Sequence, residues 1–438
     1  MKIKKTIAIL TLVALLTLVA CDSVQDIDAG EILYEQNEAP PYEETHQQDN
    51  DVEPNDEEQY DEQYADEIDE PYDTNGIIYG IEVSDFTLNV RDWDNFAWER
   101  EYFTDIGPPI RFDENMPHGY LAVQYIELLN DHLYARTPFS YREKEAAVWL
   151  VEELLAMGYS WEDIYVQEFA MLESSRWDNL MILTGPMGMW GSRNDFFDSE
   201  MRETTQLSQN VILTVPGQSE RTIIVGAHYD TWPVHGASDN ASGMALLLES
   251  ARRMLQIDNY YTIVYIFFGA EEIGLIGAEY YVANMTEEQS NNLHFMINAD
   301  VLFEGPYMVY SVAYSNLGWD SERGGIHVGT NELTQQIDAI AYELNLGLIG
   351  YPYVVQQINS DFRPFLHSGY TVVNLAGLAA AEFPYEMWTV EVDGNMFMLQ
   401  ILHTPDDDFH VIEERWPGKI TANMSAFSIF LEEMLLMG

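Results

Sequence analysis

Acidic and histidine side chains occur in this chain where buried strands should end and helices should begin. An apolar run from Thr222 to Val225 predicts one such strand, and His228 and Asp230 follow its end. Asp239 precedes an apolar pattern over Met244–Leu255 that is typical of a helix. Because ligands bind outside the carboxyl ends of strands in open α/β sheets, we expect this imidazole and these two carboxylates to meet at one edge.

Three further places carry the same kinds of side chain. Glu271 and Glu272 follow a second strand-like run, and Asp300 follows a third. His403 lies in the turn-like stretch His-Thr-Pro-Asp-Asp ahead of the last predicted helix. Taken singly, these residues have ordinary interpretations as a helix cap, a solvated face or a packed ring. Together, their carboxylates would repel one another unless they are protonated, paired or neutralised by a cation.

A divalent metal is the natural counter-charge for such a group. None of these motifs contains Lys or Arg, and imidazole and carboxylate are ligands that Zn²⁺ accepts. Cys21 is the only cysteine, which excludes a zinc site built from thiolates. The sequence therefore predicts a metal centre made of histidine and carboxylate side chains.

The elements that must position these residues follow an α/β pattern. Strand-like runs include Thr222–Ala227, Thr262–Phe268 and Phe295–Ala299, and helical patterns include Ser242–Gln256 and Ile276–Ala283. Their alternation favours an α/β fold with a mixed, largely parallel central sheet and helices on both faces. Antiparallel neighbours are expected among the first strands.

Five motifs, taken in order, resemble those of the M28 family of co-catalytic zinc peptidases. They are His228-Tyr229-Asp230, Ser238-Asp239-Asn240-Ala241-Ser242-Gly243, Gly269-Ala270-Glu271-Glu272-Ile273-Gly274, Asn298-Ala299-Asp300 and His403-Thr404-Pro405-Asp406-Asp407. The family also includes bacterial aminopeptidases, carboxypeptidases and glutaminyl cyclases. The resemblance covers roughly residues 115 to 438 and implies a zinc-exopeptidase fold of the phosphorylase/hydrolase-like type.

Carried over position by position, the resemblance implies two Zn²⁺ per chain. His228, Asp239 and Asp300 would hold one zinc. Asp239, Glu272 and His403 would hold the other, with Asp239 bridging the two ions. The charges agree with this arrangement, because two divalent ions and one hydroxide balance three carboxylates when both histidines are neutral.

The resemblance also implies supporting roles. Glu271 would be the general base, and Asp230 would orient the imidazole of the preceding histidine motif through its other nitrogen. Asp361 and Asp407 are further candidates for the surroundings of the metals, and a structural role is favoured over a catalytic one for Asp361. Leu402 stands where some family members place a tyrosine that helps the oxyanion, so that role stays unassigned.

The implied activity is hydrolysis of peptide substrates by a zinc exopeptidase, with an aminopeptidase as the leading expectation. A carboxypeptidase, a dipeptidase or a glutaminyl cyclase stays open, because the loops that would select the substrate match no pattern we can interpret. A surface binding protein without turnover is a third alternative. The complete set of ligand residues speaks against it.

The N-terminus predicts a lipoprotein. Residues 1–21 join a basic start, with Lys2, Lys4 and Lys5, to an apolar run that ends in Leu-Val-Ala-Cys21. This ending resembles a bacterial lipobox, in which Cys21 is lipidated, and an ordinary signal peptide or an uncleaved anchor helix is the alternative. We therefore expect a lipid anchor in the cell membrane, with the catalytic domain on the extracytoplasmic side.

The rest of the chain divides into three parts. Residues 22–75 form an acidic tether that we expect to be disordered, because 21 Asp and Glu and no Lys or Arg lie between Asp22 and Asp73. Residues 76–115 form an N-terminal extension of unclear structure, and 116–438 form the M28-like catalytic domain. The formal net charge of −55 argues against nucleic acid as a partner.

Overall fold

The computed structural model describes residues 106, 109–113, 115–170, 207–305, 307–315, 326–328, 331–351, 359–378, 389–392, 395–398 and 401–437, and the short strands β1 (Ile77–Ile78) and β2 (Ile81–Glu82). The predicted signal peptide with Cys21, the acidic tether and most of the extension 76–115 lie outside the described residues. Within the described part, no helix is both long enough and apolar enough to cross a lipid bilayer.

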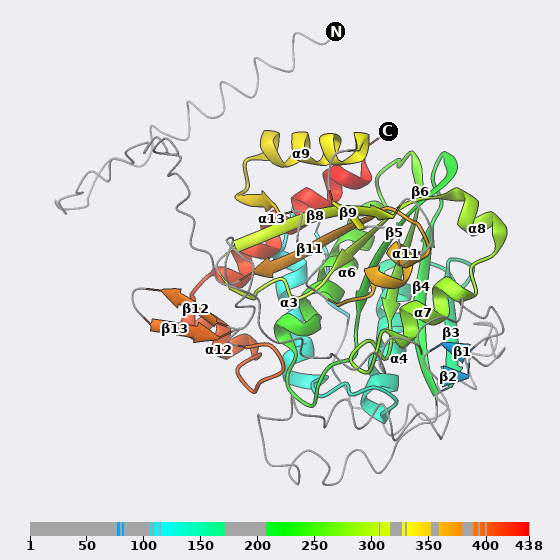
Figure 1. The fold of residues 1–438 in the computed structure, drawn as a ribbon. Helices are drawn as coiled ribbons and strands as arrows, with labels where there is room; N and C mark the ends of the chain where they lie inside the picture. Colours follow the sequence, from blue (N-terminus) through cyan, green and yellow to red (C-terminus); the bar gives the residue numbers. More distant parts are fainter. Residues whose placement is uncertain are drawn as a thin grey trace, which may run out of the picture. The chain divides into compact units, whose positions relative to one another are not determined.

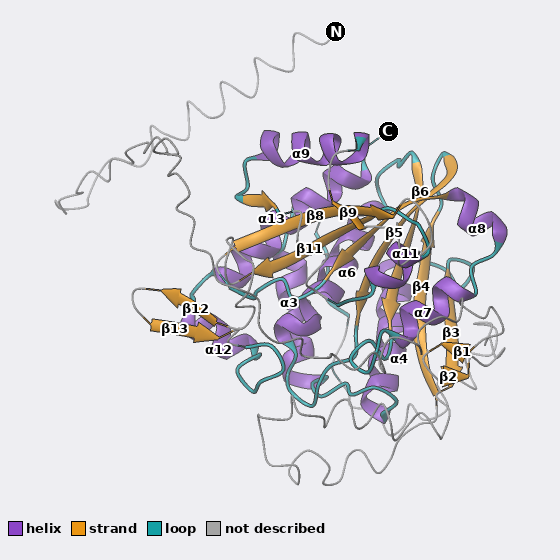
Figure 2. Ribbon diagram, in the orientation of Figure 1, coloured by secondary structure: helices purple, strands orange, loops and turns teal. Residues whose placement is uncertain are grey.

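A nine-stranded mixed sheet carries the fold (Figures 1 and 2). Its strands are β3 (Ile164–Ala170), β4 (Leu207–Val215), β5 (Ser219–His228), β6 (Tyr261–Phe268), β7 (Leu293–Ala299), β8 (Tyr307–Ser315), β9 (Ile326–Val328), β10 (Leu348–Gly350) and β11 (Val372–Leu378). The order is β10-β8-β11-β7-β5-β6-β4-β3, and β9 pairs with β8. Strands β11, β7, β5 and β6 run parallel at the centre, whereas β3, β4 and β6 pair antiparallel, as do β8 and β11.

Helices cover both faces of this sheet. The helices of the described chain are α3 (Tyr120–His132), α4 (Tyr141–Met157), α6 (Ser242–Met254), α7 (Ile276–Ala283), α8 (Glu287–Asn292), α9 (Glu332–Leu344), α11 (Phe362–His367), α12 (Phe409–Arg415) and α13 (Lys419–Leu435). On β5, Ile223 and Val225 pack in the core shared with α3, α4, α6 and α13, while Ile224 packs with α7 and α11. Burial on both faces explains the nearly continuous apolar run of this strand. The predicted α/β fold class is confirmed.

The start of α6 lies unusually close to the end of β7. A Cβ added at Gly243 would collide with the carbonyl oxygen of Ala299, so the close approach requires glycine there. Asn240 reinforces the contact by donating its side-chain amide to the Ala299 carbonyl at 3.0 Å and accepting the Gly243 N–H at 2.8 Å. This packing brings the turn before α6, which carries Asp239, against the residue that follows β7.

Candidate metal centre

Five predicted ligand residues meet at the carboxyl ends of the central strands. His228 is the last residue of β5, and Asp300 comes directly after β7. Glu272 lies in the turn after β6, and Asp239 lies in the irregular turn Ala237–Ala241 that leads into α6. His403 lies in a turn ahead of α12. Each element ends or begins at the same edge, as the crevice rule for open sheets leads one to expect.

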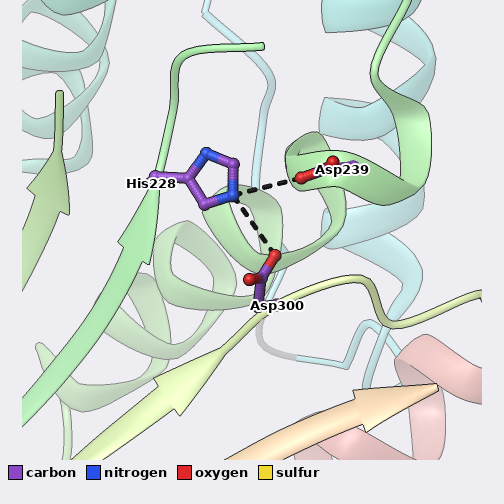
Figure 3. A group of neighbouring side chains, drawn as sticks. All are labelled: His228, Asp239 and Asp300. Atoms are coloured by element: carbon purple, nitrogen blue, oxygen red, sulfur yellow. Dashed lines mark hydrogen bonds and ion pairs between the residues drawn. The ribbon is translucent and has the colours of Figure 1, made fainter. Parts of the chain in front are cut away.

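Three of these side chains form a buried group around one imidazole. Nε2 of His228 lies 3.1 Å from Oδ1 of Asp239 and 3.2 Å from Oδ1 of Asp300. Figure 3 shows the ring at the end of its strand, with both carboxylates directed at the same nitrogen. We call this group of three the deep position, because all of its members are buried.

The other imidazole makes a second group, which we call the outer position. Nε2 of His403 lies 3.0 Å from Oδ2 of Asp239 and 3.1 Å from Oε2 of Glu272. Asp239 thus directs one carboxylate oxygen at each histidine and is common to both positions. The side chain of His403 is 37% exposed, whereas that of His228 is 1% exposed.

Both groups fit a zinc ion by their donor atoms. Each offers one imidazole nitrogen and two carboxylate oxygens that lie within 4.8 Å of one another. Two ligand atoms of one tetrahedral zinc lie roughly 3.3 Å apart, because each bond is roughly 2.0–2.1 Å long. A single N–H cannot satisfy two carboxylates well, whereas a cation between three such atoms can. The residues present therefore suit two metal ions that share Asp239.

Asp230 ties two strand ends together. Its carboxylate accepts the backbone N–H groups of Glu271 and Glu272, both at 3.1 Å. Its backbone carbonyl lies 3.1 Å from Nδ1 of His228, whereas its nearer carboxylate oxygen is 3.5 Å away. The sequence led us to expect the carboxylate to orient this ring. The backbone oxygen makes the shorter contact, because the side chain is turned toward the β6 loop.

Other groups hold the deep carboxylates in place. Asp407 accepts the backbone N–H of Ser238 at 2.5 Å and that of Asp239 at 3.0 Å, which fixes the turn that carries the shared ligand. The hydroxyl of Ser360 donates to Oδ2 of Asp300 at 2.7 Å, which leaves Oδ1 for the imidazole. These contacts are of the kind that orients metal ligands.

Asp361 is fully buried, and neither of its carboxylate oxygens has a hydrogen-bond partner among the described residues. Burial raises the pKa of this side chain well above its usual value, and Asp300 and Asp230 raise it further while His228 opposes them. An unpaired buried carboxyl of this kind is more stable when it holds a proton. Asp361 therefore differs from Asp407, whose carboxylate accepts two backbone N–H groups.

Glu271 stands beside the ligands but belongs to neither group of three. Burial raises its pKa well above the usual value; His228 acts in the opposite direction, and Glu272 raises the pKa further. The preceding residue, Ala270, has a left-handed φ of 56°, and its N–H donates to buried Glu143 at 3.0 Å. A carboxylate with a raised pKa, held on a fixed turn beside a metal centre, is suited to accept and release a proton.

One buried cation beside the centre was not among the predicted residues. Arg136, which lies between α3 and α4, is fully buried and donates through Nε to the carbonyl of Tyr229 and through Nη1 to that of Leu133, both at 2.6 Å. Burial lowers its pKa to about 10, and the carboxylates of Asp230 and Asp407 oppose the shift, so the group stays charged at neutral pH. Nothing in its sequence neighbourhood marks it, because Tyr229, Asp230 and Asp407 lie far along the chain.

Known proteins resemble the segment of the chain that carries this site. The model of Peptidase family M28 matches residues 210–428, a segment that contains every predicted metal ligand. Aminopeptidase YwaD of Bacillus subtilis is 28% identical over 224 residues, which cover 48% of this chain and 42% of that protein. An aminopeptidase of Pseudomonas aeruginosa is 31% identical over 172 residues, which cover 39% of this chain and 31% of the other. The chain thus spans less than half the length of these curated relatives.

A solved structure shares the fold. A zinc aminopeptidase from Bacillus subtilis superimposes with a TM-score of 0.53 at 16% identity, and the match covers 74% of this chain and 97% of the other. At this identity the match shows a common fold and no more. The arrangement of strands and helices around the site is therefore one that a zinc enzyme is known to use.

Proposed function

Because this chain belongs to peptidase family M28, we propose that residues 116–438 form a zinc-dependent exopeptidase that removes N-terminal residues from peptides. The observation that carries the proposal is the presence of two complete ligand groups that share Asp239. The relatives reported above are named aminopeptidases, which supports removal of residues from the N-terminal end of a peptide. The family resemblance implies one zinc for a cyclase, so the second complete ligand group favours the peptidase.

Each of these residues would have a separate role in hydrolysis. His228, Asp239 and Asp300 would hold one zinc, and Asp239, Glu272 and His403 the other. Bound zinc would supply Lewis-acid chemistry, polarising the scissile carbonyl and lowering the pKa of a water molecule toward about 7.

Glu271 would transfer the proton during hydrolysis. It would take the proton from the attacking water and deliver it to the amine that leaves, and its raised pKa suits both steps. Asp230 would keep the Glu271 backbone in place through the 3.1 Å bond to its N–H. The Glu271 side chain is only partly buried, so it can reach a water molecule at the centre.

The test is release of N-terminal residues by purified protein, with and without a chelator. We expect chelation to abolish release and added zinc to restore it. Glu271→Gln should lower the rate by roughly 10²–10⁴-fold while zinc uptake stays unchanged, because an amide cannot carry the proton. Glu279→Gln on α7 is the matched control and should keep the rate. Full activity in Glu271→Gln would contradict the assigned role.

Substrates with one blocked end show which end of a peptide the enzyme attacks. A peptide with an acetylated amine should resist the enzyme, and one with an amidated carboxyl end should not. The reverse result would make the protein a carboxypeptidase. Loss of ammonia from a peptide that begins with Gln, with no cleavage, would make it a cyclase.

For location, we propose a lipid anchor at Cys21 with the catalytic region on the extracytoplasmic side. The basic start and lipobox-like ending of residues 1–21 support it. Cells that express the full chain should incorporate labelled palmitate into it, and Cys21→Ser should remove the label and release the protein from membranes. Label retained in Cys21→Ser would refute the anchor.

A further inference from the structure

The two histidines of the centre are oriented by different means. Nδ1 of His228 lies 3.1 Å from the carbonyl oxygen of Asp230, so a hydrogen bond fixes that ring. No residue of the described chain is hydrogen-bonded to Nδ1 of His403, whose recorded polar contacts are all made through Nε2. Its backbone is left-handed, with φ 57°, and its side chain is more than one-third exposed. Among the described residues, the ring of His403 therefore has no hydrogen bond at Nδ1 to orient it, unlike the ring of His228.

The indole of Trp232 is stacked on that ring. The ring centroids are 4.5 Å apart and the planes meet at 19°, which is a face-to-face contact. Stacking restricts rotation of an imidazole about its Cβ–Cγ bond, because any large rotation would drive the ring edge into the indole. The contact leaves Nε2 directed at the carboxylates of Asp239 and Glu272.

Trp232 also contacts a second ligand of the same position. Its backbone N–H donates to Oε1 of Glu272 at 3.2 Å, while Oε2 of that carboxylate faces His403. One residue thus holds both ligands that belong to the outer position alone.

The loop that carries Trp232 is itself fixed. The N–H of Thr231 donates to the carbonyl of Arg136 at 3.1 Å, and the Thr231 hydroxyl accepts the N–H of Arg136 at 3.0 Å. Two residues past the indole, the carbonyl of Val234 accepts the N–H of Ala135 at 2.9 Å. The loop therefore lies against the segment after α3, which gives Trp232 a rigid base.

We propose that Trp232 is the positioning residue of the outer position, where its indole does for His403 what a backbone carbonyl does for His228. This inference rests on the proposed metal centre and adds a residue to it. Trp232 would touch no reacting atom, and it acts through the two ligands that it holds. Replacing groups that orient metal ligands lowers metal affinity by about 10–100-fold.

The experiment is a zinc titration of metal-free protein against a competing chelator. In Trp232→Leu, the stack is lost while the backbone bond to Glu272 remains. We expect zinc affinity at the outer position to fall by about 10-fold or more and the affinity at the deep position to change by less than about twofold. Trp232→Phe keeps an aromatic plane and should recover most of the loss. Trp161→Leu on the exposed loop before β3 is the matched control and should behave as the wild type.

The outcomes separate this inference from the proposed function. If the wild type binds no zinc, the metal centre itself is wrong. If the wild type binds zinc at two positions and Trp232→Leu does so with unchanged affinities, only the role of Trp232 is wrong. Equal losses in the Leu and Phe variants would also overturn it, because stacking would not be the cause. If Trp232→Leu fails to fold, Trp232→Met takes its place in the comparison with Trp232→Phe.

Discussion

The deep and outer positions share Asp239 and differ in how firmly their other ligands are held. At the deep position, His228 and Asp300 are buried, and each makes a further polar contact, to a backbone carbonyl and to Ser360. At the outer position, His403 is partly exposed, has a left-handed backbone and is held by a stacked ring. Ligands that are already oriented lose less freedom when they bind a metal. We infer that the deep position binds zinc more tightly.

The largest effect is expected where the two positions meet. Asp239→Asn removes the negative charge that both positions share, so zinc affinity should fall at both by well over the ~100-fold seen when supporting groups are changed. Asp300→Asn should weaken the deep position alone, and His403→Ala the outer position alone. Metal content after dialysis against a weak chelator measures all three.

A matched control for these changes is available near His403. Asp406→Asn breaks an exposed ion pair with Arg415, 2.7 Å long, and such pairs contribute about 0–1 kcal/mol. This variant should keep the metal content of the wild type. If Asp239→Asn lost zinc from one position only, Asp239 would not be shared and the comparison of the two positions would have to be abandoned.

The next effect compares a buried residue beside the centre with a ligand of the outer position by their contributions to stability. Arg136→Met removes a buried cation and leaves the carbonyls of Tyr229 and Leu133 without a donor, which should cost about 3–5 kcal/mol of unfolding free energy. His403→Ala removes the partner of Asp239 and Glu272, but at a partly exposed turn, so it should cost less unfolding free energy than Arg136→Met. Urea unfolding of the metal-free proteins measures both. Equal losses would show that His403 contributes as much to the fold as the buried Arg136.

Much of the deep position could be predicted from the sequence, because its ligands follow local rules. His228 and Asp300 come at the ends of apolar runs that form β5 and β7, and the ends of parallel strands meet at one edge. Helix α7 has the predicted bounds. Strand β8 was not predicted. It pairs antiparallel with β11, so that side of the sheet departs from the alternation of strand and helix that guided the prediction.

Arg136 and Trp232 could not have been found in the same way. Arg136 serves Tyr229, which lies 93 residues further along the chain, and nothing local distinguishes it from a surface arginine. Trp232 lies in a loop with no periodic pattern, and its stacking partner is in a different turn near the C-terminus. Residue type and position at a strand end allow metal ligands to be predicted from the sequence. The residues that hold those ligands depend on tertiary contacts, which local sequence does not show.

A third prediction compares the pH dependence of zinc binding at the two positions. Burial lowers the pKa of His228, but Glu271 and Asp300 more than compensate, so the pKa of this side chain in metal-free protein is raised well above its usual value. For His403, burial also lowers the pKa, and Glu272 and Asp239 raise it well above the usual value. Zinc binds neutral imidazole, so each position must release a proton below the raised pKa.

The sign and slope follow from that release. Zinc affinity should fall by about tenfold per displaced proton for each unit that the pH falls, and should level off above the raised pKa. Burial, together with Asp239, also raises the pKa of Glu272, so the outer position should release more protons and depend on pH more steeply. Chelator competition between pH 6 and 9 measures both slopes. Equal slopes of zinc affinity against pH would show that the two positions release the same number of protons.

The smallest effect isolates one hydrogen bond of the deep position. Ser360→Ala removes the hydroxyl that donates to Oδ2 of Asp300 at 2.7 Å, and the freed carboxylate can then turn away from the imidazole. Zinc affinity at the deep position should fall by about tenfold, the lower end of the range for supporting groups, with no change at the outer position. Ser290→Ala, which removes a hydroxyl bonded to Tyr370 on the α8 side, is the matched control. If Ser360→Ala left the deep position unchanged, burial alone would hold Asp300, and the contrast with the outer position would rest on exposure rather than on hydrogen bonding.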